Sequence, residues 1–230
     1  VNRGPDHTNL IKNSGLNFVH TLLSMTGEFT VQPVIKNNVV FLLNGEIYNF
    51  NKTRDYPSDI YFIIDLYFKY GDDFVKHLDG EYSIVIVDNN KSEAIFTTDT
   101  FGIKPLFYAI ENEEIGISSY EEPLIELGFK QTIKVEPSTI KKINLINKKV
   151  VFSRKYFEFN LRQHKNSYSS WIESFLNAIT KRFEDTDKKI ILPLSSGFDS
   201  GAIACAFNML NIPSTFYSFY NYEHVKVINK

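Results

Sequence analysis

Residues 39–49 read VVFLLNGEIYN, an apolar run that ends in Asn44-Gly45. Five consecutive Val, Phe and Leu residues bounded by a turn signal are typical of a β-strand. Asn-Gly is the commonest two-residue hairpin turn, so one interpretation makes the chain reverse there. The next residues, Glu46 to Asn49, form a poor returning strand, which favours a different role for Asn44 and Gly45.

Further β-type runs follow this stretch as far as Phe152, separated by turn formers such as DNN at 88–90 and EPS at 136–138. The runs, all rich in Val, Ile, Phe and Tyr, are Val39–Leu43, Tyr82–Val87, Ala94–Thr97, Leu106–Ala109, Ile115–Ser118, Ile140–Ile143 and Val150–Phe152. One helix interrupts them, with Ser58 as its N-cap and Gly71 as the residue that ends it. Apolar residues surround most of this helix, as expected of a helix packed against a sheet.

The pattern changes after Phe159, where residues 160–169 are polar, lack periodicity and are expected to form a linker. Ser170 and Glu173 then have the spacing of a helical capping box. The buried face of the helix that follows is expected to hold Trp171, Phe175, Ile179 and Phe183.

A β-turn-α-β order ends the chain: strand Ile190–Leu194, a Ser/Gly turn, helix Ser200–Leu210 and strand Thr215–Phe219. This order predicts the opening of a doubly wound parallel α/β domain. Because about one and a half repeats cannot cover both faces of such a sheet, we expect this domain to be truncated here.

Composition excludes several classes of protein. The 230 residues include 25 Lys and Arg against 27 Asp and Glu, so the net charge of −2 favours neither nucleic acid nor an acidic tail. Apolar residues make up 43%, with 20 Phe and 13 Tyr, which predicts a substantial core. No stretch suits a membrane span or a signal peptide, so a cytoplasmic location is expected. The single cysteine, Cys205, excludes an internal disulfide and is expected in a helix core.

The sequence LSSGFDS at 194–200 joins the predicted strand to the predicted helix. A small-residue turn before a helix N-terminus offers free backbone N–H groups to a pyrophosphate. The expected ATP-binding residues are Leu194, Ser195, Ser196, Gly197, Asp199 and Ser200. Asp199 would repel phosphate by itself, which indicates a bridging Mg²⁺. The alternative is an ordinary strand-to-helix connection in which Ser and Asp act as caps.

This loop resembles the SGGxDS loop of ATP pyrophosphatases, with Ser196 in place of a glycine. Six strings precede it in order: RGPD at 3–6, QP at 32–33, NGEIYN at 44–49, SD at 58–59, DGEY at 79–82 and DTFGIKPLFY at 99–108. In this arrangement the chain resembles glutamine-dependent asparagine synthetases. The resemblance implies an α+β N-terminal nucleophile hydrolase sandwich (αββα) at 1–159 and a partial parallel-sheet PP-loop ATPase domain at 160–230.

The resemblance also implies roles for residues of the first domain. Asn44 and Gly45 match an oxyanion hole for glutamine hydrolysis, and Glu46 and Asp59 match the acids that hold the α-ammonium group of glutamine. In the second domain ATP would activate an acidic acceptor such as aspartate, which ammonia then converts to an amide. A homodimer is compatible with the family, while the sequence says nothing about oligomeric state.

Three departures from the family pattern bear on activity. Leu22 stands where the family has an arginine that binds the glutamine carboxylate, and Thr98 replaces another arginine. The N-terminal cysteine nucleophile is absent from the sequence, and Cys205 belongs to the wrong domain. Two alternatives to a glutamine-hydrolysing ligase therefore remain: a β-lactam-synthetase-like ligase with a non-hydrolysing first domain, or an inert truncated module.

Overall fold

The computed structural model describes residues 3–50, 56–183 and 188–219. The chain divides into two compact units, residues 1–161 and 162–230. The first unit holds β1 (His7–Asn13), β2 (Leu16–Leu22), β3 (Val34–Lys36), β4 (Val39–Ile47), α1 (Asp59–Tyr70), the 3-10 helix η1 (Gly71–His77), β5 (Gly80–Asp88), β6 (Glu93–Thr98), β7 (Phe107–Glu111), β8 (Glu114–Ser118), α2 (Glu122–Glu126), β9 (Ile133–Lys134), β10 (Thr139–Asn144) and β11 (Lys149–Lys155).

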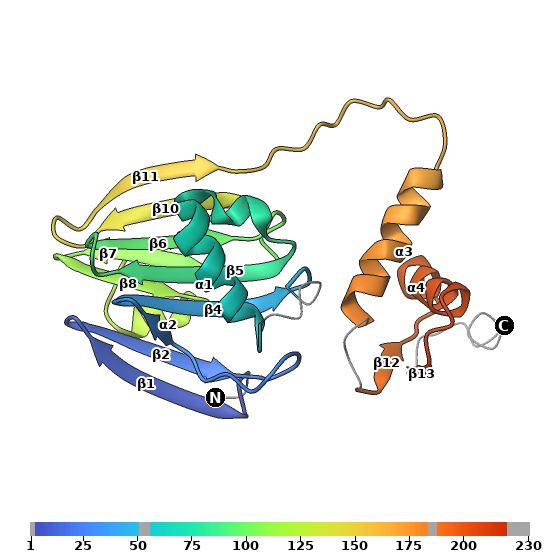
Figure 1. The fold of residues 1–230 in the computed structure, drawn as a ribbon, viewed down its shortest axis with the longest axis horizontal. Helices are drawn as coiled ribbons and strands as arrows, with labels where there is room; N and C mark the ends of the chain where they lie inside the picture. The colour runs from blue at the N-terminus through green and yellow to red at the C-terminus, as the bar shows by residue number, and fades with distance from the viewer. Residues whose placement is uncertain (1–2, 51–55, 184–187, 220–230) are drawn as a thin grey trace. The chain divides into compact units, whose positions relative to one another are not determined.

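Six strands of this unit form one antiparallel sheet in the order β11-β10-β6-β5-β4-β3. Helix α1 lies across one face of the sheet (Figure 1). Phe41 of β4 and Ile84 of β5 meet Ile60 and Ile63 of α1 in a core from which water is excluded. Ser58 precedes the helix and Gly71 follows it, as the sequence predicts.

The opposite face of the sheet packs against a second β layer. Val40, Val87 and Phe96 point to this side and meet Phe18 of β2 and Tyr108 of β7. This layer consists of the β1–β2 hairpin and the small sheet β8-β7-β9, and α2 covers the outside of the small sheet. The αββα sandwich expected for the first part of the chain is therefore confirmed, with a five-residue α2 on its outer side.

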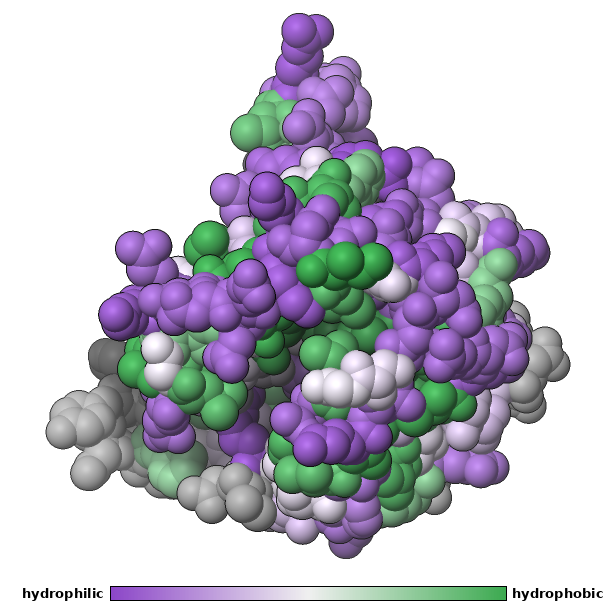
Figure 2. Space-filling model, turned by 90° about the vertical axis from the view of Figure 1, so that its left-hand side faces the viewer, coloured by the Kyte–Doolittle hydropathy of each residue, from purple (hydrophilic) through white to green (hydrophobic). Residues whose placement is uncertain are grey.

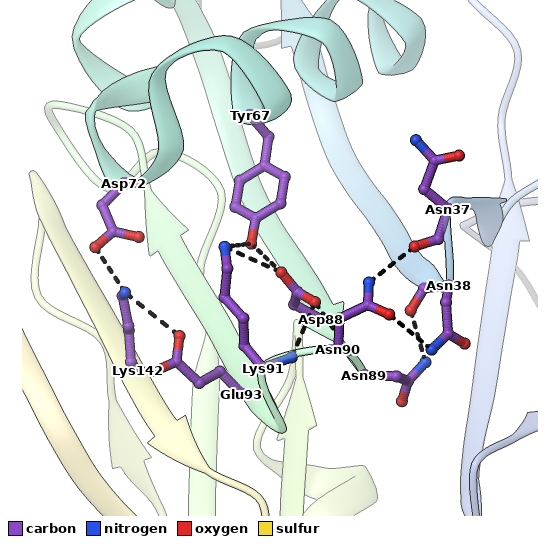
Figure 3. A network of polar contacts seen from close by, with 10 residues as sticks. All are labelled: Asn37, Asn38, Tyr67, Asp72, Asp88, Asn89, Asn90, Lys91, Glu93 and Lys142. Atoms are coloured by element: carbon purple, nitrogen blue, oxygen red, sulfur yellow. Dashed lines mark hydrogen bonds and ion pairs between the residues drawn. The ribbon is translucent and has the colours of Figure 1, made fainter.

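A network of polar contacts ties α1 and η1 to the sheet (Figure 3). The Tyr67 hydroxyl of α1 donates to Asp88 at 2.7 Å, and Lys91 Nζ lies 3.1 Å from both oxygens. Lys142 of β10 reaches Asp72 of η1 at 2.7 Å. These contacts join the β5–β6 turn to α1 and strand β10 to η1, which fixes the helical layer over the sheet.

Hydrophilic side chains dominate the face shown in Figure 2, and hydrophobic ones appear in smaller groups between them. The apolar side chains of β4, β5 and β6 are enclosed between layers instead. None of the helices in the described residues is long and apolar enough to span a membrane.

The second unit contains α3 (Ser169–Phe183), β12 (Ile190–Pro193), α4 (Phe198–Met209) and β13 (Ser214–Tyr217). Strands β12 and β13 pair in parallel, so the predicted β-α-β order is confirmed. A small core of Ile179, Ala206 and Phe207 joins the two helices to the strands.

Three expectations for this unit were wrong. Trp171 is exposed and stacks on Phe175, because the buried stripe of α3 centres on Ile179. Ser170 is inside α3, which begins one residue earlier, so it is not the cap. Cys205 is exposed, because the described part of α4 buries the side that carries Ala206 and Phe207.

Candidate functional site

The candidate site begins where β4 extends beyond its neighbour. Strand β3 pairs only with Val39–Phe41, whereas β4 continues to Ile47. At Leu43 two side chains take the place of a strand: the N–H donates to Gln32 Oε1 at 2.7 Å, and the carbonyl oxygen lies 3.1 Å from His20 Nε2. Since both backbone groups of Leu43 are engaged there, they point away from β5.

Alternation along the strand then fixes the direction of the next backbone groups on this edge. The pairing of β4 with β5 is continuous, so the groups of Gly45 and Ile47 point the same way as those of Leu43. The Ile47 N–H donates to Asp59 Oδ2 at 3.3 Å. The Gly45 N–H lies between these two and has no hydrogen-bond acceptor among the residues that the structure describes.

Glycine is required at this point of the sheet. Gly45 has φ 149°, and a Cβ on it would collide with the carbonyl oxygen of Glu81. Gly80 is constrained in the same way by the carbonyl oxygen of Glu46. The two strands thus approach closely here, and Asn44-Gly45 lies inside β4 rather than at a hairpin turn.

The Asn44 side chain projects between the two β layers. Its Nδ2 donates to Ser119 Oγ, which follows β8, at 3.3 Å. Next to Ser119, the ring of Tyr120 lies under the guanidinium group of Arg3 at 4.5 Å. Sequence reasoning missed Ser119 and the location of Arg3, since neither has a local sequence signal.

Glu46 lies two residues after Asn44 and therefore on the same face of β4. Its carboxylate accepts a hydrogen bond from the Thr26 hydroxyl. Burial, and then the negative charge of Glu46, raise the pKa of Asp59 to about 7. Two acids this close together favour a bound cation, because a positive charge relieves their repulsion.

Leu22 is buried, with only 9% of its surface exposed, and it offers no positive charge. It ends β2, and its carbonyl oxygen accepts the Asp6 N–H at 3.0 Å. The described residues therefore supply no cation at the position where the resemblance expects an arginine.

The residues of the predicted phosphate loop lie together between β12 and α4. The Ser195 N–H donates to Ser200 Oγ at 3.0 Å, and the Gly197 N–H donates to Ser195 Oγ at 3.2 Å. An anion that displaced these hydroxyls would meet two N–H donors directed at it. Asp199 is exposed in the first turn of α4. No cluster of three or more metal-binding side chains occurs in the described residues.

Comparison with known proteins adds to this geometry. A family model described as a glutamine amidotransferase domain matches residues 1–160. A putative glutamine-hydrolysing asparagine synthetase of Methanocaldococcus jannaschii is 30% identical over 218 residues, covering 82% of this chain and 40% of the relative. The glutamine-hydrolysing asparagine synthetase of Zea mays is 28% identical over 218 residues, covering 88% and 36%. The chain thus spans about two fifths of these relatives.

Two solved structures share the fold. Glutamine phosphoribosylpyrophosphate amidotransferase from Bacillus subtilis matches with a TM-score of 0.50 at 18% identity, covering 86% of this chain and 50% of that one. A structure described as the allosteric regulatory enzyme of purine biosynthesis matches with a TM-score of 0.52 at 16% identity, covering 91% and 53%. At these identities the likeness concerns the fold alone.

Proposed function

Because the chain belongs to the glutamine amidotransferase domain family, we propose that its first unit binds L-glutamine along the open edge of β4. The side-chain amide would lie at Asn44 and Gly45, and the α-ammonium group at Glu46 and Asp59. The observation that carries this proposal is that the Gly45 N–H has no acceptor among the described residues, while the Ile47 N–H, two residues later, donates to Asp59.

The chemistry of amide hydrolysis matches these groups. Attack on the amide carbon places negative charge on its oxygen, which the Gly45 N–H and the Asn44 side-chain amide would stabilise. The carbon–nitrogen bond then breaks, ammonia leaves, and water releases glutamate from the nucleophile. The family resemblance assigns the nucleophile to an N-terminal cysteine. The residues Asn44, Gly45, Glu46 and Asp59 would supply substrate binding and charge stabilisation.

The acids at the other end of the site match an ammonium group. The raised pKa of Asp59 reflects its burial and the charge of Glu46. An α-ammonium group would pair with both carboxylates and favour their ionised forms.

For the second unit, the proposal is an ATP-dependent ligase reaction. The loop from Leu194 to Ser200 would hold the phosphates of ATP, and Asp199 would hold a Mg²⁺ ion that neutralises part of their charge. A carboxylate of an acidic acceptor such as aspartate attacks the α-phosphorus and expels pyrophosphate. Ammonia then displaces AMP from the adenylate and leaves the amide.

A second candidate function is favoured by the burial of Leu22 at the position where the resemblance expects an arginine for the glutamine carboxylate. A β-lactam-synthetase-like ligase would keep this sandwich without hydrolysing glutamine and would take its amine from the substrate itself.

Calorimetric titration of the 230-residue chain distinguishes these functions. We expect saturable binding of L-glutamine, weakened at least tenfold by Glu46→Gln, and no binding of D-glutamine. If the folded, unmodified chain bound no L-glutamine, the result would favour the β-lactam-synthetase-like ligase. For the loop, Asp199→Ala should weaken Mg²⁺-ATP binding, and unchanged affinity would contradict the assignment.

A further inference from the structure

The open edge of β4 is held by two side chains that the proposed chemistry does not use. Gln32 is 6% exposed, and its Oε1 accepts the Leu43 N–H at 2.7 Å. His20 approaches the Leu43 carbonyl from β2, which belongs to the other β layer. Both the N–H and the carbonyl oxygen of Leu43, the residue before Asn44, are therefore hydrogen-bonded by these side chains.

The bond at the carbonyl fixes the protonation of the His20 ring. A carbonyl oxygen only accepts, so Nε2 carries the hydrogen, and Nδ1 of the neutral ring is an acceptor. Nδ1 is buried and has no partner in the described part of the chain. Burying Nδ1 without a partner lowers the stability of the fold, and an apolar side chain at this position would avoid that cost. The favourable contribution of His20 therefore comes from the hydrogen bond that Nε2 donates to the Leu43 carbonyl oxygen.

Without these two side chains, the described residues would offer no hydrogen-bond partner to the outward backbone groups of β4 between Phe41 and Ile47. An unsupported strand edge moves more freely and exchanges its hydrogen bonds with water. Asn44 and Gly45 would move with it, and a small displacement of oxyanion donors removes much of their effect.

We propose that Gln32 and His20 form a backbone clamp on Leu43 that positions Asn44 and Gly45. They are positioning residues, since they act through Leu43 and touch no reacting atom. The inference rests on the proposed function for its catalytic meaning. The clamp itself can be tested without a ligand.

Gln32→Met keeps the size of the side chain and removes the acceptor, whereas Gln32→Glu keeps an oxygen acceptor. Lys36→Met is the matched control, because it breaks an ion pair with Asp65 on the same edge without touching Leu43. In ¹⁵N-resolved NMR spectra of the ligand-free chain, Gln32→Met should speed Leu43 amide exchange and shift the Asn44 side-chain and Gly45 amide signals. Gln32→Glu should restore them, and Lys36→Met should leave them unchanged. His20→Phe should reproduce the effect of Gln32→Met at Asn44 and Gly45.

Binding provides the functional readout. L-Glutamate is the probe, because its γ-carboxylate carries negative charge where the oxyanion would form. We expect Gln32→Met to bind it at least tenfold more weakly than the unmodified chain does. Unmoved Asn44 and Gly45 signals in folded Gln32→Met would overturn the clamp. If those signals move but the unmodified chain binds neither L-glutamine nor L-glutamate, the clamp stands and the proposed function fails.

Discussion

Gly45 lies so close to the carbonyl oxygen of Glu81 on the neighbouring strand that no side chain fits between them. The strand pair β4–β5 therefore brings the Gly45 N–H to the open edge of the sheet without any turn in the chain. Gly45 therefore allows β4 and β5 to approach closely and also provides the N–H donor at the edge of the sheet.

Gly45→Ala should consequently disrupt the site. Its Cβ meets backbone rather than a flexible side chain, so the strands must separate, at a cost of about 2–4 kcal/mol in the free energy of unfolding. Urea denaturation measures this loss, and L-glutamine binding should disappear with it. Gly15→Ala is the control, since Gly15 also has positive φ but open space around it. It should cost about 1 kcal/mol, and equal losses in both variants would contradict the clash.

Glutamine affinity should rise with pH through about 7, the value to which burial and Glu46 raise the pKa of Asp59. Below that pH the Asp59 carboxyl is protonated, and an ammonium ligand must displace the proton before it can pair. The dissociation constant should therefore increase by up to about tenfold per pH unit below 7. Calorimetric titrations between pH 5.5 and 8 measure this, and Asp59→Asn should bind weakly with a flat profile. If the affinity of the unmodified chain did not change with pH, Asp59 would not contact the ammonium group.

His20 should make the fold less stable in mild acid. Burial lowers the pKa of its ring below the ordinary value of 6.5, so the unfolded chain takes up the proton first. Stability is fully present above 6.5 and is lost as the pH falls towards the folded value, by at most about 1.4 kcal/mol per pH unit. In urea titrations, His20→Gln should show a shallower loss of stability between pH 6.5 and 5. Identical slopes for the two proteins would exclude His20 as the source.

Strands buried on both faces could be predicted from the sequence alone. Val39–Leu43 is a continuous apolar run, and Tyr82–Val87 is apolar except for Ser83, because helix α1 covers one face of these strands and the second β layer the other. The helix that Ser58 and Gly71 bound was equally clear, because both of its ends carry residues suited to caps.

The hairpin β1–β2 gave no such signal. Along β1 the inward side holds Asn9 while the outward side holds Leu10, which is 69% exposed, so polarity does not alternate with burial. Asn9 is accommodated because its side chain donates to the Gln32 carbonyl oxygen at 3.1 Å. A long-range contact of this kind leaves no mark on the local pattern.

The candidate site was reached by resemblance for Asn44, Gly45, Glu46 and Asp59, and their roles remain predictions. Gln32 lies in one of the strings that carry the resemblance, but the sequence predicts no role in the site for it or for His20. Their partner is the backbone of Leu43, and no residue type signals where a neighbouring strand ends.

The loop that begins at Asp99 opens the DTFGIKPLFY string, and its geometry indicates how strongly the fold depends on it. Asp99 is 1% exposed. Its Oδ1 accepts the N–H groups of Phe101 and Ile103 at 2.9 and 3.1 Å, and its Oδ2 those of Lys104 and Tyr82 at 3.2 Å each. Four donors therefore converge on one buried carboxylate.

Asp99→Asn should remove about 3–5 kcal/mol from the free energy of unfolding. One oxygen becomes an NH₂ group that cannot accept, so two hydrogen bonds to a charged group are lost and a donor faces donors. Urea denaturation measures the change. Asp65→Asn is the matched control, because it removes a carboxylate from an exposed pair with Lys36 and should cost less than about 1 kcal/mol. If Asp99→Asn and Asp65→Asn lowered the free energy of unfolding equally, the four N–H groups would have other acceptors, and Asp99 would not organise the loop.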